Sequence, residues 1–328
     1  MTEATVLPPD QDRSLRHYLT EWLAHARGRV RATTHQGYEG VIRLYALPAL
    51  GEVALHDLTP LHLQRLYGSL LDPHRGLSAG TVLNLHLVLT QALGQAVRWG
   101  ILQVNPAAGA QPPRPVRPEP VVVDPALASR IVASLRGTPV EVPAMMALST
   151  GMRRGEILAL RWKDLDPGLT CAQVRRTLHT TSGRLGFSEP KTRRSRRAVA
   201  LPGMLRPHLE RHREDQENRR SASRSWQDLD LVVEKGDGGP LNPDTLSSRW
   251  RLFLRRSGLP HVRFHDLRHA HATLMLLKGV HPKVVSERLG HASVGITLDL
   301  YSHVLPSMQS EAVRAFDDLF GVVPQASL

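Results

Sequence analysis

The sequence is poor in cysteine and in long apolar runs. Its single cysteine, Cys171, excludes an internal disulfide and any zinc site built from several cysteines, and its neighbours indicate a packing role rather than a nucleophile. No stretch approaches the roughly eighteen consecutive apolar residues of a membrane span. Residues 1–12 lack the basic and apolar regions of a signal peptide. We therefore expect a soluble, cytoplasmic protein without a membrane partner.

Acidic residues are also few beside the basic ones. The chain has 30 Asp and Glu against 42 Lys and Arg, a formal net charge of +12, and most of the excess is arginine. The planar guanidinium matches phosphate oxygens with paired hydrogen bonds, so we expect a polyanionic partner, nucleic acid ahead of membrane. The 328 residues exceed the size at which single cores usually stop growing, about 250 to 300 residues, which predicts two domains.

Residues 14–104 predict a small all-helical domain after an N-terminal tail of residues 1–13. Apolar residues recur at helical spacing in four segments, and Ser14, Thr59 and Ser78 stand where helix N-caps are expected. Pro60, directly after Thr59, suits the first turn of a helix. No residue cluster in this domain looks catalytic, so the chemistry is expected further along the chain.

The composition changes after residue 104. Residues 105–120 carry six prolines and almost no core-forming side chain, which predicts an extended linker over 105–123. The second domain is expected over 124–321, before a tail of residues 322–328. Most of it has helical periodicity, but residues 169–201 predict a three-stranded antiparallel unit. The predicted fold class is therefore α+β, mainly α with a small antiparallel β-sheet.

The first of four motifs in the second domain is T-G-M-R-R-G-E, residues 150–156. Charged residues of this kind most often form a solvated helix face. Here, however, a Thr-Gly turn would hold Arg153 in place, and Glu156 lies three residues on, where its carboxylate can orient a guanidinium. The motif therefore predicts a fixed arginine.

The second motif is E-P-K-T-R-R-S-R-R-A-V-A-L, residues 189–201, on a predicted hairpin turn. Its cations are Lys191, Arg193, Arg194, Arg196 and Arg197. A charged turn at a sheet edge can simply discourage aggregation. These cations repel one another unless an anion lies nearby, so we favour contacts of the four arginines with a DNA backbone.

The third motif is F-H-D-L-R-H-A-H-A-T-L, residues 264–274. His265 and His269 are four apart and share a helix face, which raises the alternative of a metal site. A zinc protease would need Glu next to the first histidine, where this chain has Asp266, so no metal is expected. His265 and Arg268, three apart, instead suit a clamp for a phosphate.

The fourth motif is R-L-G-H-A-S-V-G-I-T-L-D-L-Y, residues 288–301. A helix that begins near Pro282 should stop at Gly290, which presents His291 just after the helix end. Ser293 is expected to cap the next helix, with Tyr301 on it or just beyond. Periodicity alone makes Tyr301 one more core aromatic.

Taken in order, these residues resemble the tyrosine recombinase family, the phage integrase family of site-specific recombinases. The resemblance rests on Arg153 in T-G-x-R, Lys191 on the hairpin, His265 and Arg268 in H-x-L-R, His291 in L-G-H, and Tyr301 ten residues later. It extends from about residue 14 to residue 320. It implies a helical core-binding domain and a catalytic domain that close around double-stranded DNA as a clamp.

The resemblance also implies the reaction, which is strand cleavage and rejoining through a 3′-phosphotyrosyl intermediate, with no cofactor, metal or ATP. Tyr301 would be the nucleophile. Arg153 and Arg268 would hold the nonbridging oxygens of the phosphate, with His291 as a further hydrogen-bond donor. Lys191 would give a proton to the departing 5′ oxygen, and His265 would take the proton of the tyrosine.

Several alternatives stay open. Within the family, the chain is either an integrase of a phage or mobile element, which the pattern of residues 47–67 favours, or a chromosome-dimer or plasmid resolvase. The early first helix, at Ser14, indicates that an arm-binding domain is lacking. Outside these, a relaxing topoisomerase and an inactive DNA-binding protein are disfavoured. We expect a tetramer on DNA with accessory DNA-bending or directionality factors, and a C-terminal helix with Phe316 and Phe320 that packs on its own domain or on a neighbouring protomer.

Overall fold

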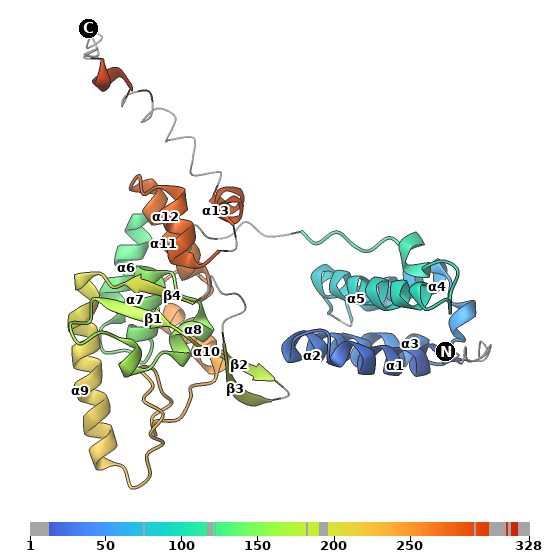
Figure 1. The fold of residues 1–328 in the computed structure, drawn as a ribbon, viewed down its shortest axis with the longest axis horizontal. Helices are drawn as coiled ribbons and strands as arrows, with labels where there is room; N and C mark the ends of the chain where they lie inside the picture. Colours follow the sequence, from blue (N-terminus) through green and yellow to red (C-terminus); the bar gives the residue numbers. More distant parts are fainter. Residues whose placement is uncertain are drawn as a thin grey trace, which may run out of the picture. The chain divides into compact units, whose positions relative to one another are not determined.

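The computed structural model describes residues 13–74, 76–116, 121, 123–181, 183–189, 196–291, 293–301, 313 and 316–320, with the backbone alone at 296 and 299–301. The chain divides into two compact units, residues 1–119 and 120–328 (Figure 1). Within the described ranges, no helix has both the length and the apolar character needed to cross a membrane.

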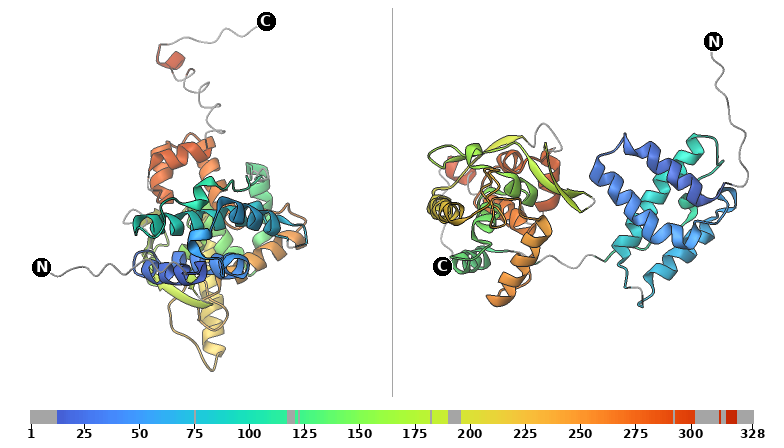
Figure 2. Two further views of the ribbon diagram at one scale, coloured as in Figure 1. Left: turned by 90° about the vertical axis from the view of Figure 1, so that its right-hand side faces the viewer. Right: turned by 90° about the horizontal axis from the view of Figure 1, so that it is seen from below.

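The first unit is built of helices, which Figure 2 shows from two further sides. They are α1 (Leu15–Arg27), α2 (Ala32–Val41), the π-helix η1 (Ile42–Ala46), α3 (Leu47–Leu50), the 3₁₀ helix η2 (Leu55–Asp57), α4 (Pro60–Leu71), α5 (Ala79–Arg98) and the 3₁₀ helix η3 (Pro106–Gly109). The predicted caps are confirmed, since Ser14, Thr59 and Ser78 are the N-caps of α1, α4 and α5. The apolar faces of these helices meet in a core in which Tyr18, Leu63 and Leu89 are fully buried.

The residues that follow α5 correct the linker prediction. Asn105 caps η3 by accepting from the Ala107 amide, and its Nδ2 donates to the Thr90 carbonyl at 2.9 Å. Ala107 and Ala110 are buried in the core of the first unit. The expectation of a segment without core contacts is therefore wrong for residues 105–110. Pro106 begins η3, and the small alanines that follow it fit against α4 and α5.

The second unit holds the remaining elements. They are α6 (Pro125–Leu135), α7 (Glu141–Thr150), α8 (Arg154–Ala159), the 3₁₀ helix η4 (Trp162–Asp164), β1 (Cys171–Val174), β2 (Thr177–Thr181), β3 (Arg184–Ser188), β4 (Arg197–Ala200), the 3₁₀ helix η6 (Gly203–Leu205), α9 (Arg206–Ala222), α10 (Pro243–Arg256), α11 (Asp266–Leu277), α12 (Pro282–Leu289) and α13 (Val294–Tyr301). The predicted class, mainly α with antiparallel strands, is confirmed.

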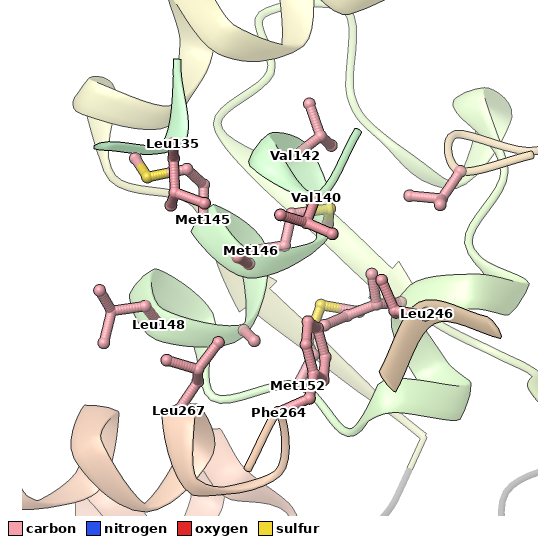
Figure 3. Packing of buried hydrophobic residues seen from close by; sticks show 14 of the residues in the cluster. Leu135, Val140, Val142, Met145, Met146, Leu148, Met152, Leu246, Phe264 and Leu267 are labelled. Carbon is pink, nitrogen blue, oxygen red and sulfur yellow. The ribbon is translucent and has the colours of Figure 1, made fainter. Parts of the chain in front are cut away.

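Helix α7 lies at the centre of this unit. Nearly every one of its residues is buried, and Figure 3 shows Met145 and Met146 of α7 among Met152, Phe264 and Leu267. A helix that is apolar all round is held from every side. The turn that follows α7, where the first motif lies, therefore starts from a fixed point.

The strands differ from the predicted three-stranded unit. The described strands form two antiparallel pairs, β1 with β4 and β2 with β3. The strand conformation is interrupted between β1 and β2 at Arg175 and Arg176. There, Arg176 Nη2 donates to the Ala159 carbonyl at 2.9 Å. Its guanidinium also lies over the Phe187 ring, 4.7 Å from the ring centroid. These contacts turn the expected long strand into two short ones.

Candidate active site

Arg153 is fixed at the junction of α7 and α8. Gly151 ends α7 in the left-handed conformation, with φ 69°, which suits glycine because it has no side chain. Arg153 is the N-cap of α8, and its amide donates to Glu156 Oε2 at 2.8 Å. Its Nη1 donates to Glu156 Oε1 at 2.9 Å, and its Nη2 donates to the Gly290 carbonyl at 3.3 Å. The predicted orientation of Arg153 by Glu156 is thus present.

Glu156 is the buried carboxylate of this site, with 3% of its side chain exposed. Burial alone would raise its pKa, but Arg197 and Arg153 lower it, and the net shift is downward. Glu156 therefore stays ionised at neutral pH, and it attracts two guanidinium groups from different elements.

Arg268 lies on the first turn of α11 and is almost fully buried, at 4% exposure. Its Nη1 donates to the Gly151 carbonyl at 2.6 Å and its Nη2 to the Leu289 carbonyl at 2.8 Å. These two bonds connect α11 to the turn that carries Arg153 and to the end of α12. The two arginines predicted to hold a phosphate thus lie at one junction.

His265 and His269 stand together at the start of α11. Their ring centroids are 5.2 Å apart, with the rings nearly perpendicular. Desolvation, followed by the neighbouring His269 and Arg268, lowers the pKa of His265 to about 4. His265 is therefore neutral at pH 7 and has a nitrogen that can accept a proton. Among the described residues, no cluster of three or more metal-ligating side chains is present.

His291 follows the end of α12, as predicted. Gly290 caps this helix in the left-handed conformation, with φ 68°, and the His291 amide donates to the Ser286 carbonyl at 3.0 Å. His291 Nδ1 lies 2.9 Å from Thr297 Oγ1 of α13. Burial, with Arg268 and Arg153 nearby, lowers the pKa of His291 to about 4. A neutral imidazole here can donate a hydrogen bond without adding charge.

Some predicted site residues lie outside the described ones. Lys191, Arg193 and Arg194 belong to this group. Tyr301 is the last residue of α13, and its side chain is not among those described. Arg196 is described and pairs with Glu189, with about half of its side chain exposed.

Arg197 corrects the prediction of a backbone contact with DNA. Its side chain is 7% exposed, and its Nη2 lies 3.0 Å from Glu156 Oε2. In a strand, alternate side chains point to opposite faces, and Arg197 shares the inner face with buried Val199. Arg196 lies outside, but Arg197 is an internal partner of the site. The prediction of a surface contact is therefore wrong for Arg197.

Three further residues of the site were not predicted. Arg288 donates from Nε to His271 Nε2 at 3.1 Å, and His271 Nδ1 lies 2.9 Å from the Leu148 carbonyl. Thr297 is fully buried against His291. His271 and Arg288 lie within the third and fourth motifs, but only the packing of α7, α11 and α12 reveals that they meet.

The arrangement gathers positive charge around one point. The guanidinium groups of Arg153, Arg197 and Arg268 converge on the end of α12, and Glu156 is the carboxylate among them. Neutral imidazoles stand beside them. Such a site suits an anion with several oxygens, in which negative charge grows during the reaction.

Comparisons with known proteins agree with this geometry. Residues 129–308 match the phage integrase family, and residues 14–71 match the phage integrase N-terminal SAM-like domain. A tyrosine recombinase XerC-like protein of Caldanaerobacter subterraneus is 30% identical over 333 residues, which cover 94% of this chain and 84% of that protein. The ICEBs1 integrase of Bacillus subtilis is 35% identical over 174 residues, which cover 53% of this chain and 47% of that integrase.

A solved structure shares the fold. The Tn1549 transposon integrase, in complex with a circular intermediate DNA, superposes with a TM-score of 0.77 at 19% sequence identity. The superposition covers 92% of this chain and 99% of that one. The chain therefore belongs to the phage integrase family and is a site-specific recombinase of the tyrosine type.

Proposed function

We propose that this recombinase integrates or excises a phage or other mobile element by cleaving and rejoining DNA strands through a 3′-phosphotyrosyl intermediate. The observation that carries the proposal is the meeting of Arg153, Arg268 and His291 at the end of α12, just before α13, whose last residue is Tyr301. The similarity to the ICEBs1 integrase supports the choice of a mobile element.

The first obstacle to the reaction is the negative charge of the phosphodiester, which the arginines neutralise. Arg153 and Arg268 bind the nonbridging oxygens and stabilise the negative charge that grows on them in the pentavalent transition state. His291 supplies a further hydrogen bond as a neutral donor. Because these groups are already held by Glu156 and by main-chain carbonyls, little reorganisation is needed when DNA arrives.

The second obstacle is that a phenol is a weak nucleophile and an alkoxide a poor leaving group, and two proton transfers overcome it. Tyr301 Oη forms a bond to phosphorus as the bond from phosphorus to the 5′ oxygen breaks. His265 accepts the phenolic proton, and the bound phosphate favours the imidazolium that results. Lys191 gives a proton to the 5′ oxygen, which leaves as a hydroxyl. Attack of a partner strand's 5′ hydroxyl reverses these steps and releases Tyr301, so no external energy source is required.

The domain assignments follow from the same proposal. Residues 14–104 form the core-binding domain and residues 124–321 the catalytic domain, and together they grip double-stranded DNA as a clamp. The family matches over residues 14–71 and 129–308 support this division. Recombination of two duplexes cuts four strands, and each chain supplies one Tyr301, so the active assembly is a tetramer. The exposed Arg196 contacts the DNA backbone, as do Arg193 and Arg194.

A resolvase of chromosome dimers or plasmids is the second candidate, because the relative from Caldanaerobacter subterraneus carries the name XerC-like. The DNA around the coding sequence separates the two. Direct repeats at both ends of an inserted segment favour an integrase, and a single site in a chromosome or plasmid without such an insert favours a resolvase.

Trapping of the covalent intermediate tests the reaction. The substrate is a duplex selected by binding from a random library and nicked near the cleavage point, so that the short fragment that carries the new 5′ hydroxyl diffuses away after cleavage. The wild-type protein should form a covalent adduct that survives denaturing electrophoresis. Tyr301→Phe should bind the duplex equally well and form none. An adduct with the variant would overturn the assignment of Tyr301, and no adduct with the wild type would favour a DNA-binding protein.

A further inference from the structure

The last carbonyl groups of α12 are each occupied by an arginine from another element. The Arg288 carbonyl accepts from Arg197 Nε at 2.7 Å, the Leu289 carbonyl from Arg268 Nη2 at 2.8 Å, and the Gly290 carbonyl from Arg153 Nη2 at 3.3 Å. Carbonyls at the end of a helix have no partner inside it and carry the negative end of its dipole. This turn therefore serves as a docking point for three guanidinium groups.

We propose that Arg197 is a positioning residue of the active site, which acts with the terminal turn of α12 to aim Arg153 at the scissile phosphate. The inference rests on the proposed function, because it assigns Arg197 a part in that reaction. Arg197 does not contact DNA itself. It acts through Glu156 and through the main chain of α12.

The first support is the geometry of the pair with Glu156. Arg197 Nη1 donates to Glu156 Oε1 at 3.2 Å and Nη2 to Oε2 at 3.0 Å. The same Oε1 also accepts from Arg153 Nη1. Arg153 is the more exposed partner, with 38% of its side chain accessible, whereas Arg197 has 7%. The buried arginine thus fixes the carboxylate, and the carboxylate fixes the arginine that faces solvent.

The second support is the close packing of Arg197 on Gly290. A Cβ at position 290 would lie 3.1 Å from Arg197 Nη1 and 3.3 Å from its Cδ and Cζ. A side chain there would require Arg197 to shift by a few tenths of an ångström. Gly290 is therefore needed for more than its left-handed conformation, because it also leaves room for Arg197.

The third support is a reciprocal link between α12 and β4. Arg197 of β4 donates to the Arg288 carbonyl of α12, and Arg288 Nη2 donates back to the Ala200 carbonyl of β4 at 2.8 Å. Arg288 Nη2 also donates to the Ser149 carbonyl of α7 at 3.1 Å. The strand, the helix end and the central helix are thus fixed relative to one another. Figure 1 shows α11 and α12 adjacent in this part of the unit, and they contact each other.

The chemistry of arginine explains why another cation does not suffice. Arg197 donates from Nε to the Arg288 carbonyl and from both Nη atoms to the Glu156 carboxylate, so all three nitrogens of its planar guanidinium form hydrogen bonds. Lysine carries a single ammonium on a flexible stem and cannot make these bonds at fixed angles. A positioning role therefore predicts a defect in Arg197→Lys as well as in Arg197→Met.

The test compares cleavage of two substrates under single-turnover conditions with saturating DNA. One is the nicked duplex described above, and the other carries a methylphosphonate at the scissile position, which removes the negative charge that Arg153 neutralises. On ordinary DNA, we expect adduct formation by Arg197→Met to be slower by about 100-fold, the effect of one misplaced donor for a growing charge. On methylphosphonate DNA, the defect should shrink to less than about 10-fold, because less charge stabilisation is required.

Arg161→Met is the matched control. Arg161 pairs through Nε and Nη2 with the buried Asp164, so the variant also breaks an arginine–carboxylate pair of the second unit, but outside the site. It should lose stability and still cleave both substrates within about 3-fold of the wild-type rate. The affinity of each variant for DNA and its thermal unfolding are measured in parallel. Cleavage is then assayed below the transition temperature of the less stable protein.

The outcomes separate the two proposals. Cleavage by Arg197→Met at the wild-type rate, or equal slowing on both substrates, would overturn the positioning role. Recovery of the wild-type rate by Arg197→Lys would do the same. If Arg197→Met does not fold, Arg197→Lys, which keeps the charge, gives the same comparison of substrates. Absence of an adduct with the wild-type protein would instead reject the proposed function.

Discussion

The two units of the chain differ in what they bury. Among the described residues, every buried polar or charged side chain of the types Glu, Asp, Arg, His, Gln, Ser and Thr lies in the second unit. The first unit buries leucines, alanines and aromatic rings. Its phenols Tyr18 and Tyr67 are fully covered, and burial raises their pKa values well above the ordinary value.

This difference separates stability from chemistry. Burying a charge is unfavourable unless it is paired, and a well-packed apolar core is at least as stable. The second unit nevertheless buries Glu156 and Arg268, and the proposed reaction explains this, because a reacting phosphate requires donors that are held in fixed positions. A buried phenol such as Tyr18 is held in the protonated form, which is the opposite of what a nucleophile requires.

The comparison is tested most strongly at Glu156. Glu156→Gln removes the charge that Arg153 and Arg197 share, and we expect adduct formation to slow by at least about 100-fold. The free energy of unfolding of the second unit should fall by about 3–5 kcal/mol, because the buried guanidinium of Arg197 loses its charged partner. Single-turnover cleavage and urea unfolding measure the two effects.

Asp164→Asn is the control for Glu156→Gln. Asp164 is buried and pairs with Arg161, so the variant should lose a comparable free energy of unfolding. Cleavage by its folded form should stay near the wild-type rate. If both variants slow cleavage equally, buried charge in this unit serves stability alone, and the distinction between the units fails.

Core substitutions in the first unit should lower stability without slowing cleavage. Leu89→Ala leaves a cavity in the core of α1, α4 and α5, and we expect a loss of about 3–4 kcal/mol in the free energy of unfolding. Adduct formation at saturating DNA should not change below the unfolding temperature. Leu87→Ala, on the exposed side of the same helix, should cost less than about 0.5 kcal/mol. Slow cleavage by folded Leu89→Ala would show that this core also serves the chemistry.

A fall in pH should lower the free energy of unfolding of the second unit through protonation of His271. Burial, followed by the nearby Arg288, lowers the pKa of His271 to about 4. Between about pH 6.5 and pH 4, the unfolded chain binds a proton that the folded histidine does not. Stability therefore falls as the pH falls through this window, by up to about 3 kcal/mol. Above pH 6.5 this contribution does not vary.

His271→Gln removes the titration. Its free energy of unfolding should start lower than that of the wild type at pH 7, since the bond from Arg288 is weakened, but fall less steeply between pH 6.5 and pH 4. Urea unfolding at several pH values gives both slopes. Parallel slopes for the two proteins would mean that His271 is not held neutral in the fold.

Local features of the site could be predicted from sequence because they depend on neighbours along the chain. Gly151 and Gly290 end helices in the left-handed conformation, so the positions of Arg153 and His291 followed from a turn signal. The bond between Arg153 and Glu156 likewise spans three residues. The caps of the first unit were predictable for the same reason.

The features that were missed depend on contacts between distant segments. Arg197 looked like one more cation of a basic turn, and only the approach of β4 to α12 makes it internal. The break after β1 depends on the bond from Arg176 to the Ala159 carbonyl, 17 residues away. The packing of Ala107 in the first core depends on α4 and α5 lying close enough to receive it.

The smallest expected effect concerns a buried polar group that has no part in the chemistry. The Tyr18 hydroxyl donates to the Ala92 carbonyl of α5. Tyr18→Phe keeps the ring and removes this bond, so the free energy of unfolding should fall by about 1 kcal/mol. Tyr38→Phe, which removes a bond to Gln91 at the surface, should change it by less than about 0.5 kcal/mol. Adduct formation should be unaffected by either variant. A loss of several kcal/mol in Tyr18→Phe would mean that the first unit also depends on a polar bond inside its core, and the contrast between the two units would then be one of degree.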